Sequence, residues 1–215
     1  MIICIFATLD LSDIMYVNEA LFSQFLSEKE ITWMGVDFSI AKFTRNGFDY
    51  PMEVLQHYIT EWNHLIISDQ KKYDIRIAFR KPVMHYDLAF ITKRNKSIKA
   101  QNLLVENLKI SHQYSEEYIL LYCKNLDIPQ YSQFTLTVIV ESFDQDSKTA
   151  SVWVVLLHTE SKEVVLCEKF LKSPAGFGTK NYWARVFYNL FFDIQKNSFL
   201  RWVNLVKGDK GKTES

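Results

Sequence analysis

The sequence lacks an excess of charge, since 25 lysine and arginine residues balance 25 aspartate and glutamate residues among 215. Without an overall basic surplus, no global field attracts nucleic acid or an anionic membrane. Cysteine is scarce: the three residues are widely spaced and form no Cys-x-x-Cys pair, which excludes a disulfide framework and a cysteine-based zinc site. No apolar run is long enough to cross a membrane, so we expect no transmembrane span.

What the chain has in quantity is apolar and aromatic residues. Apolar residues make up 48% of the sequence, with 16 phenylalanines and 11 tyrosines, which is enough for a sizeable core and excludes a disordered chain. No internal repeat or low-complexity linker marks a second domain. We therefore predict a single domain at 31–207, preceded by an N-terminal extension at 1–30 and followed by a polar tail at 208–215.

The second half of the sequence predicts an antiparallel meander that ends in a long helix. Short polar turns join three apolar segments, at 133–142, 150–158 and 163–171. Turns this short cannot hold a crossover helix, so neighbouring strands must be antiparallel. The first segment alternates apolar and polar residues and predicts one buried face, whereas the second is apolar on both faces and predicts a central strand. A helix at 179–196 follows, with Thr179 expected to cap it.

The first half is more varied and predicts a strand at 31–37 and an amphipathic helix at 51–66. Residues 72–80 fit either a helix or a strand. Further along we expect a strand at 85–91, a basic loop at 93–99 and a short helix at 115–123. The predicted fold class is α/β (α+β): a single mixed sheet with a C-terminal antiparallel meander. The helices at 51–66 and 179–196 should pack on one face of it.

The N-terminus allows two interpretations. The segment Ile2–Ala7 resembles the apolar part of a secretory signal, but no basic residue precedes it, and Asp10 and Asp13 follow. It is either a degenerate or truncated signal peptide or the beginning of an N-terminal helix that continues through 20–26. The first interpretation implies export, and the second does not.

No arrangement of residues predicts a metal, a cofactor or a catalytic centre. His57, Glu61 and His64 share one helix face with the spacing of metal ligands. That face lies opposite the apolar stripe and is expected to point into solvent, where a metal would need ligands from another element. No Gly-x-Ser-x-Gly elbow surrounds Ser39, and the glycines near residue 177 lack the full pattern of a phosphate-binding loop.

Two groups of residues are candidates for a binding site. Asp37 and Ser39 end the first strand, where α/β proteins often place functional groups. The long helix begins with unpaired N–H groups, next to the second set of candidates: Gly176, Gly178, Asn181, Tyr182 and Trp183. We expect the strand end to lie near this helix start. Either the Asp37 carboxylate accepts the free N–H groups as a structural lock, or Asp37 and Asn181 converge on a pocket.

Two motifs carry a resemblance to a known family: Gly35-Val-Asp-Phe-Ser39 and Gly176-Phe-Gly-Thr-Lys-Asn-Tyr-Trp183. They resemble the motifs of a family of uncharacterised bacterial proteins that usually carry a signal peptide, over about 31–196. In topology alone, the expected element order is similar to the N-terminal domain of TolB and to the curli-secretion lipoprotein, which act in envelope assembly.

These resemblances imply a non-enzymatic, envelope-associated or secreted protein that binds a protein partner. The alternative is a small-molecule-binding or hydrolytic domain with a cleft near Asp37 and Asn181.

Overall fold

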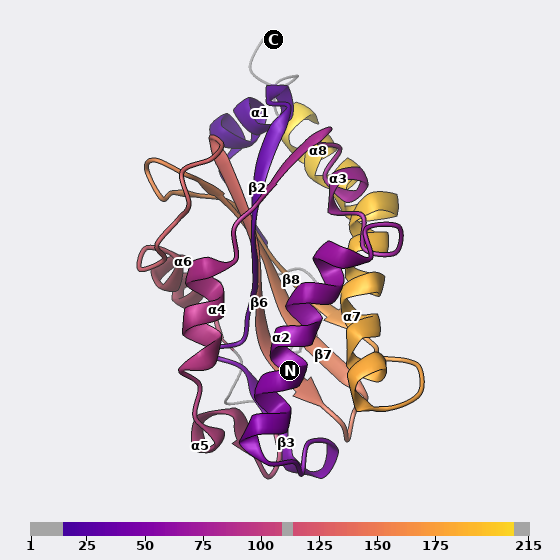
Figure 1. Ribbon diagram of the computed structural model, residues 1–215. Helices are drawn as coiled ribbons and strands as arrows, with labels where there is room; N and C mark the ends of the chain where they lie inside the picture. Colours follow the sequence, from indigo (N-terminus) through magenta and orange to yellow (C-terminus); the bar gives the residue numbers. More distant parts are fainter. Residues whose placement is uncertain (1–14, 109–113, 209–215) are drawn as a thin grey trace, which may run out of the picture.

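The three apolar segments of the second half form the centre of a mixed sheet in the computed structural model, which describes residues 15–108 and 114–208 (Figure 1). The described strands are β1 (Met15–Val17), β2 (Glu30–Asp37), β3 (Lys42–Thr44), β4 (Val83–Tyr86), β5 (Leu104–Val105), β6 (Phe134–Asp144), β7 (Thr149–His158) and β8 (Val164–Lys172). Their order is β1-β8-β7-β6-β2-β4, and β3 and β5 extend the sheet beside the end of β6. The mixed sheet expected from the sequence is confirmed.

The meander has the predicted antiparallel pairing of β6 with β7 and of β7 with β8. β7 is buried on both faces from Ala150 to Leu157, as its apolar pattern indicated. For β6 the prediction that only one face is buried was wrong, because Thr135, Thr137 and Glu141 on the polar face are buried as well. Glu141 is tolerated there because Lys169 Nζ lies 2.9 Å from one of its oxygens and the Trp153 indole donates to the other at 2.7 Å.

The first half departs from the prediction around residue 88. The strand expected at 85–91 ends at Tyr86, and most of the expected loop at 93–99 belongs to a helix. Its N-cap residue, Leu88, carries no side-chain cap, and the Asp87 carboxylate just before it accepts the Ala89 N–H at 2.9 Å. Its polar composition hid it, since few apolar residues were present to show a helical period. The ambiguous segment 72–80 contains one short helix, Ile75–Ala78.

Helices cover both faces of the sheet (Figure 1). They are α1 (Glu19–Ser27), α2 (Met52–Ser68), α3 (Ile75–Ala78), α4 (Ala89–Lys96), α5 (Ala100–Leu103), α6 (Glu116–Cys123), α7 (Thr179–Asp193) and α8 (Phe199–Gly208), with a 3₁₀ turn η1 (Arg45–Gly47) and a π-helical turn η3 (Ile194–Ser198). α1, α2, α3, α7 and α8 bury their apolar sides in the larger core, as expected for the helices at 51–66 and 179–196. α6 covers the opposite face, over the smaller core.

Residues 15–30 pack into the same domain and are not a separate extension. β1 pairs with β8, and Phe22 and Phe25 of α1 are fully buried in the larger core. A helix over 20–26 is present as α1, but the expected continuous helix from the first residues was wrong, because β1 precedes α1 at Met15–Val17. The signal-like segment and the tail after Gly208 lie outside the described residues. Among the helices of 15–108 and 114–208, none has both the length and the apolar character needed to cross a membrane.

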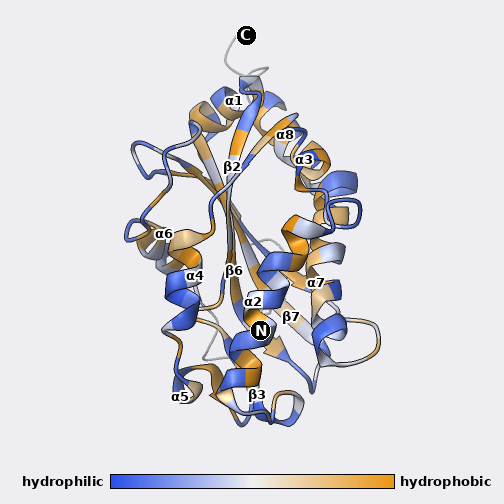
Figure 2. Ribbon diagram, in the orientation of Figure 1, coloured by the Kyte–Doolittle hydropathy of each residue, from blue (hydrophilic) through white to orange (hydrophobic). Residues whose placement is uncertain are grey.

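Aromatic rings fill the larger core, and apolar residues line the sheet-facing sides of the helices (Figure 2). Phe143 at the end of β6 lies at the centre of this cluster. Its ring stacks 4.5 Å from Trp183 of α7 and 4.9 Å from Phe43 of β3, measured between ring centroids. The Phe143 ring therefore packs β6 of the meander against β3 and α7.

Phe143→Ala is expected to lower the free energy of unfolding by about 3–5 kcal/mol, because it removes a fully buried ring and leaves a cavity between three elements. Urea denaturation of the two proteins measures this difference. Phe192→Ala is the matched control, since that ring is 49% exposed and its loss should cost much less. A loss for Phe143→Ala no larger than for the control would contradict this account of the core.

Candidate functional site

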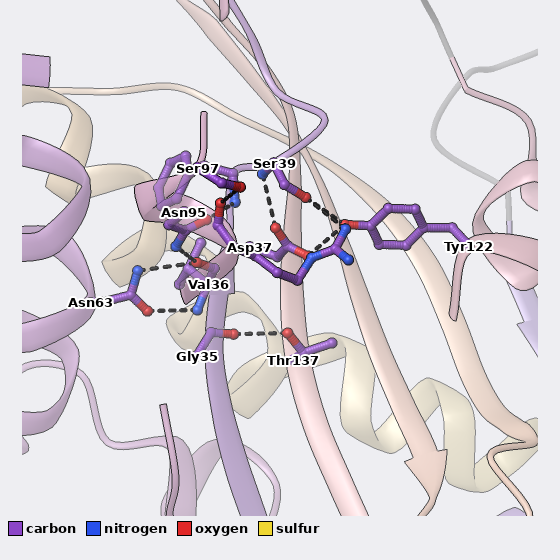
Figure 3. Close-up of polar contacts among 11 residues, drawn as sticks. Gly35, Val36, Asp37, Ser39, Asn63, Asn95, Ser97, Tyr122 and Thr137 are labelled. Atoms are coloured by element: carbon purple, nitrogen blue, oxygen red, sulfur yellow. Dashed lines mark hydrogen bonds and ion pairs between the residues drawn. The ribbon is translucent and has the colours of Figure 1, made fainter. Parts of the chain in front are cut away.

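The end of β2 extends past its neighbour β4, so its backbone needs partners other than a strand. β4 stops opposite Trp33, and two asparagine side chains take over from there (Figure 3). Asn63 of α2 accepts the Val36 N–H at 2.7 Å and donates to the Val36 carbonyl at 3.0 Å. Asn95 of α4 accepts the Phe38 N–H at 2.8 Å and donates to the same carbonyl at 2.9 Å. The two amides thus replace the missing strand.

Gly35 makes room for this arrangement. Its φ is +112°, a conformation that residues with a side chain rarely adopt. A Cβ at this position would lie 2.9 Å from Asn63 Oδ1 and 2.9 Å from the Leu88 side chain. On the opposite side, the Thr137 hydroxyl donates to the Gly35 carbonyl at 2.9 Å. Glycine is therefore required both by the backbone conformation and by the close approach of α2.

An irregularity in β2 decides which way Asp37 points. The pairing of β2 with β6 shifts its register between Trp33 and Gly35. Strict alternation would place Asp37 on the same face as Ile31 and Trp33, which is the face covered by α7. The shift moves Val36 to that face, and Asp37 therefore points to the face covered by α6.

Asp37 is buried, with 1% of its surface exposed, and its carboxylate is fully engaged (Figure 3). One oxygen accepts the Ser39 N–H at 2.8 Å, and the other accepts the Tyr122 hydroxyl at 2.5 Å. Arg94 Nε of α4 lies 3.3 Å from that second oxygen as an ion pair. The Ser39 hydroxyl completes the cluster, 2.7 Å from the Tyr122 hydroxyl and 2.9 Å from an Arg94 amino group.

This cluster is a structural lock, but the predicted one was wrong, because Asp37 accepts the Ser39 N–H and the Tyr122 hydroxyl and not the N–H groups at the start of α7. Burial and the nearby Asp37 carboxylate raise the pKa of Tyr122 above its usual value, so the phenol stays protonated and serves as a donor. Burial also raises the pKa of the adjacent Cys123 thiol to about 12, which makes it a poor nucleophile. Asp37 joins the end of β2 to α4 and α6, and each of its oxygens is already paired.

The second candidate group, around the start of α7, lies on the other side of the sheet. Trp183 is buried in the larger core, and the partly buried Tyr182 packs against it. Asn181 is exposed, and its side-chain amide donates to the Phe177 carbonyl at 3.4 Å. Asp37 and Asn181 are therefore not neighbours, because the register shift in β2 placed them on opposite faces.

The expected cap at Thr179 was wrong. The N-cap residue of α7 is Gly178, and its position carries no side-chain cap. The Thr179 hydroxyl lies instead 2.8 Å from the hydroxyl of Tyr50, in the segment before α2. This contact ties the start of α7 to a neighbouring loop.

The loop before α7 presents one aromatic side chain to solvent. Phe177 is 95% exposed, the highest value among the large apolar residues that the structure shows to be exposed. It lies between Gly176, with φ +118°, and Gly178, with φ +77°. Backbone bonds hold the loop: the Ala175 N–H donates to the Tyr182 carbonyl at 3.1 Å, and the Tyr182 N–H to the Gly178 carbonyl at 2.9 Å. The loop is thus tied to α7 through its backbone, while the Phe177 side chain is left in solvent.

The three metal-competent residues of α2 lie on its outer side. His57 and His64 are exposed, as predicted, and Glu61 lies 3.5 Å from Lys180. Within 15–108 and 114–208, no three His, Cys, Asp or Glu side chains are arranged to hold a metal ion.

Sequence reasoning missed the residues that organise the site: Asn63, Arg94, Asn95 and Tyr122. A signal existed for Asn63 alone, since it lies on the apolar stripe of α2 between Ile59 and Ile66. A polar residue on a buried stripe must have a buried partner. The other three lie on short helices without clear apolar periodicity.

Comparisons with known proteins leave the family open. A scan against protein-family models finds no match, and a search of curated proteins finds none. Among solved structures, protein XCC0632 from Xanthomonas campestris, of family DUF330, is 18% identical with a TM-score of 0.24. That alignment covers 39% of this chain and about half of the other, 53%.

The hypothetical protein CT253 from Chlamydia trachomatis is 12% identical with a TM-score of 0.31, over 84% of this chain and 99% of that one. Both scores are too low to carry an argument. The resemblances to an uncharacterised bacterial family and to TolB and the curli-secretion lipoprotein stay predictions.

Asp37→Ala is expected to lower the free energy of unfolding by about 3 kcal/mol, because it removes the carboxylate that pairs with the partly buried Arg94 and accepts the Tyr122 hydroxyl. Asp127→Ala removes an exposed carboxylate and is the control. Guanidinium denaturation measures both. A loss near that of the control would mean that Asp37 is not a lock.

Tyr122 also predicts a pH dependence. Because its pKa is raised in the folded state, the folded protein keeps the phenol proton after the unfolded chain, with a pKa near 10.0, has released it. The resulting stabilisation is complete below pH 10 and is lost as the pH rises through the folded pKa. Tyr122→Phe should therefore lose stability less steeply above pH 10 than the wild type. Denaturant titrations of both proteins below and above pH 10 measure this difference, and equal slopes would contradict the role of the buried phenol.

Proposed function

We propose that this protein is a non-enzymatic binding protein of the cell envelope or the secreted space, and that it recognises a protein partner. The observation that carries the proposal is Phe177, held almost completely in solvent by a loop of fixed conformation. Such a side chain contributes nothing to the core. It is instead available as an anchor residue for a complementary pocket.

The fixed loop strengthens the case for binding. A flexible loop would lose conformational freedom when its partner binds, and that loss would weaken the complex. Here the backbone bond from Ala175 to Tyr182 ties the loop to the first turn of α7, and the contact between Tyr50 and Thr179 joins the start of that helix to a neighbouring loop. Burial of the Phe177 ring against a partner is worth about 1.5–3 kcal/mol. Because the ring contributes nothing to folding, this free energy would contribute to binding alone.

The Asp37 carboxylate is occupied by contacts inside the fold, and this supports a function without catalysis. The carboxylate and hydroxyl that the sequence placed at the end of β2 are bound to Arg94, Tyr122 and the backbone. Asp37 and Asn181 do not meet, so the small-molecule or hydrolytic alternative has no shared cleft on which to rest. The apolar segment Ile2–Ala7 supports the part of the proposal that concerns the envelope or export. N-terminal sequencing of the protein from fractionated cells tests that part.

Phe177→Ala is expected to leave the free energy of unfolding within about 0.5 kcal/mol of the wild type, since the side chain has no contacts to lose. Partner binding should weaken about tenfold or more, as for an anchor residue. Benzoylphenylalanine at position 177 of the full chain provides the measurement in the native cells, because it crosslinks what touches the loop. A discrete protein adduct is expected. The substitution at position 177 should not change the thermal unfolding of the protein.

The matched control places the same crosslinker at Leu121, which is 62% exposed on α6, on the other face of the sheet. An adduct that forms from both positions, or from neither, would reject the loop as the binding site.

A further inference from the structure

The exposed side of the C-terminal helix differs from the rest of this neutral chain. Between Ile194 and Gly208 the sequence contains three basic residues, Lys196, Arg201 and Lys207, and no acidic residue. All three are exposed. Because the whole chain has no net charge, this basic character is local to one helical segment.

The same side carries apolar residues that the fold does not use. Leu200 is 49% exposed and Leu205 is 47% exposed, whereas the core contacts of α8 come from Phe199, Trp202 and Val206. The two leucines line one shallow hollow of about 580 Å³. Its other lining residues are Lys196, Asn197, Arg201 and Asn204. Apolar and basic side chains therefore share one continuous surface.

Neighbouring residues extend this surface and reduce one of its charges. Phe192, just before the π-helical turn, is 49% exposed, and Lys196 Nζ lies 5.7 Å from its ring centre. Arg201 forms an ion pair with the buried Glu168, so part of its charge is compensated. Acidic residues flank the segment in the sequence, Asp193 before it and Asp209 after it, and the Asp193 carboxylate pairs with Lys172 at 2.6 Å. Lys196 and Lys207 remain as the main sources of positive charge.

We propose that this face of α8 rests on an anionic lipid surface. A helix that lies in the membrane interface inserts its exposed apolar side chains between headgroups while its basic residues meet anionic lipids. Nucleic acid would pair with the basic residues but would not bury the two leucines, so it does not account for the apolar part of this surface. The site is independent of the Phe177 loop, which lies at the other end of the continuous helical segment 179–208 (Figure 1).

The strength of such binding follows from its parts. Each basic residue near an anionic leaflet strengthens binding by about fivefold, and the effect disappears beyond a Debye length. Two leucines that are already half buried add a modest apolar contribution. The association should therefore be weak, reversible and sensitive to salt.

Flotation of the full chain with vesicles tests the proposal. We expect binding to phosphatidylcholine vesicles that contain phosphatidylglycerol, little binding to phosphatidylcholine alone, and release at high salt. Lys196→Gln with Lys207→Gln should weaken binding by roughly 25-fold, which is two factors of about five. Leu200→Ser with Leu205→Ser should also weaken it. The matched controls, Lys93→Gln with Lys124→Gln and Leu121→Ser, change exposed residues elsewhere and should bind as the wild type does.

Thermal unfolding of each variant identifies any that fail to fold. The lysine variant removes no apolar contact, so it remains informative if the leucine variant is unstable. Equal binding to neutral and anionic vesicles, or unchanged binding by the lysine variant, would overturn the proposal. So would binding to duplex DNA or to an acidic protein with no binding to vesicles, because the charge would then serve another partner. The crosslinking result at position 177 stands or fails separately from all of these outcomes.

Discussion

The hydrogen bonds at the end of β2 are the constraint on which the rest of the structure depends. β4 ends too early to pair with Val36 and Phe38, and unpaired backbone groups in a buried strand are costly. Asn63 and Asn95 supply the missing partners, so α2 and α4 are fixed to the sheet by polar contacts as well as by packing. Gly35 is required because any Cβ would displace the first of these amides.

These hydrogen bonds at the end of β2 also determine where the buried polar residues lie. With the end of β2 fixed, Asp37 points under α6, where Arg94, Tyr122 and the Ser39 backbone satisfy it. A second buried carboxylate, Glu141, is paired with Lys169 and Trp153 on the same face. Both carboxylates hold the smaller face of the sheet together. The recognition that we propose therefore uses the surface of the protein and not these buried groups.

The surface offers two places for it, at opposite ends of one helical segment. The loop before α7 presents Phe177, and α8 presents leucines among basic residues. Because the segment 179–208 is continuous, a contact at one end leaves the other end accessible (Figure 1). In the arrangement that we propose, α8 contacts a lipid surface and the loop before α7 contacts a protein partner.

The sequence by itself determined the meander, the amphipathic helix α2 and the aromatic helix α7, because each buries a face whose period appears directly in the residues. It did not determine the short polar helix α4, whose position is set by Asp87 and by the needs of a strand edge formed elsewhere in the chain. It also placed Asp37 beside α7 in error. The prediction took the end of β2 to lie beside the start of α7, but a register shift against β6 turns the carboxylate to the other face. Such a shift arises only when two distant strands pair, so tertiary structure alone decided which polar residues would meet.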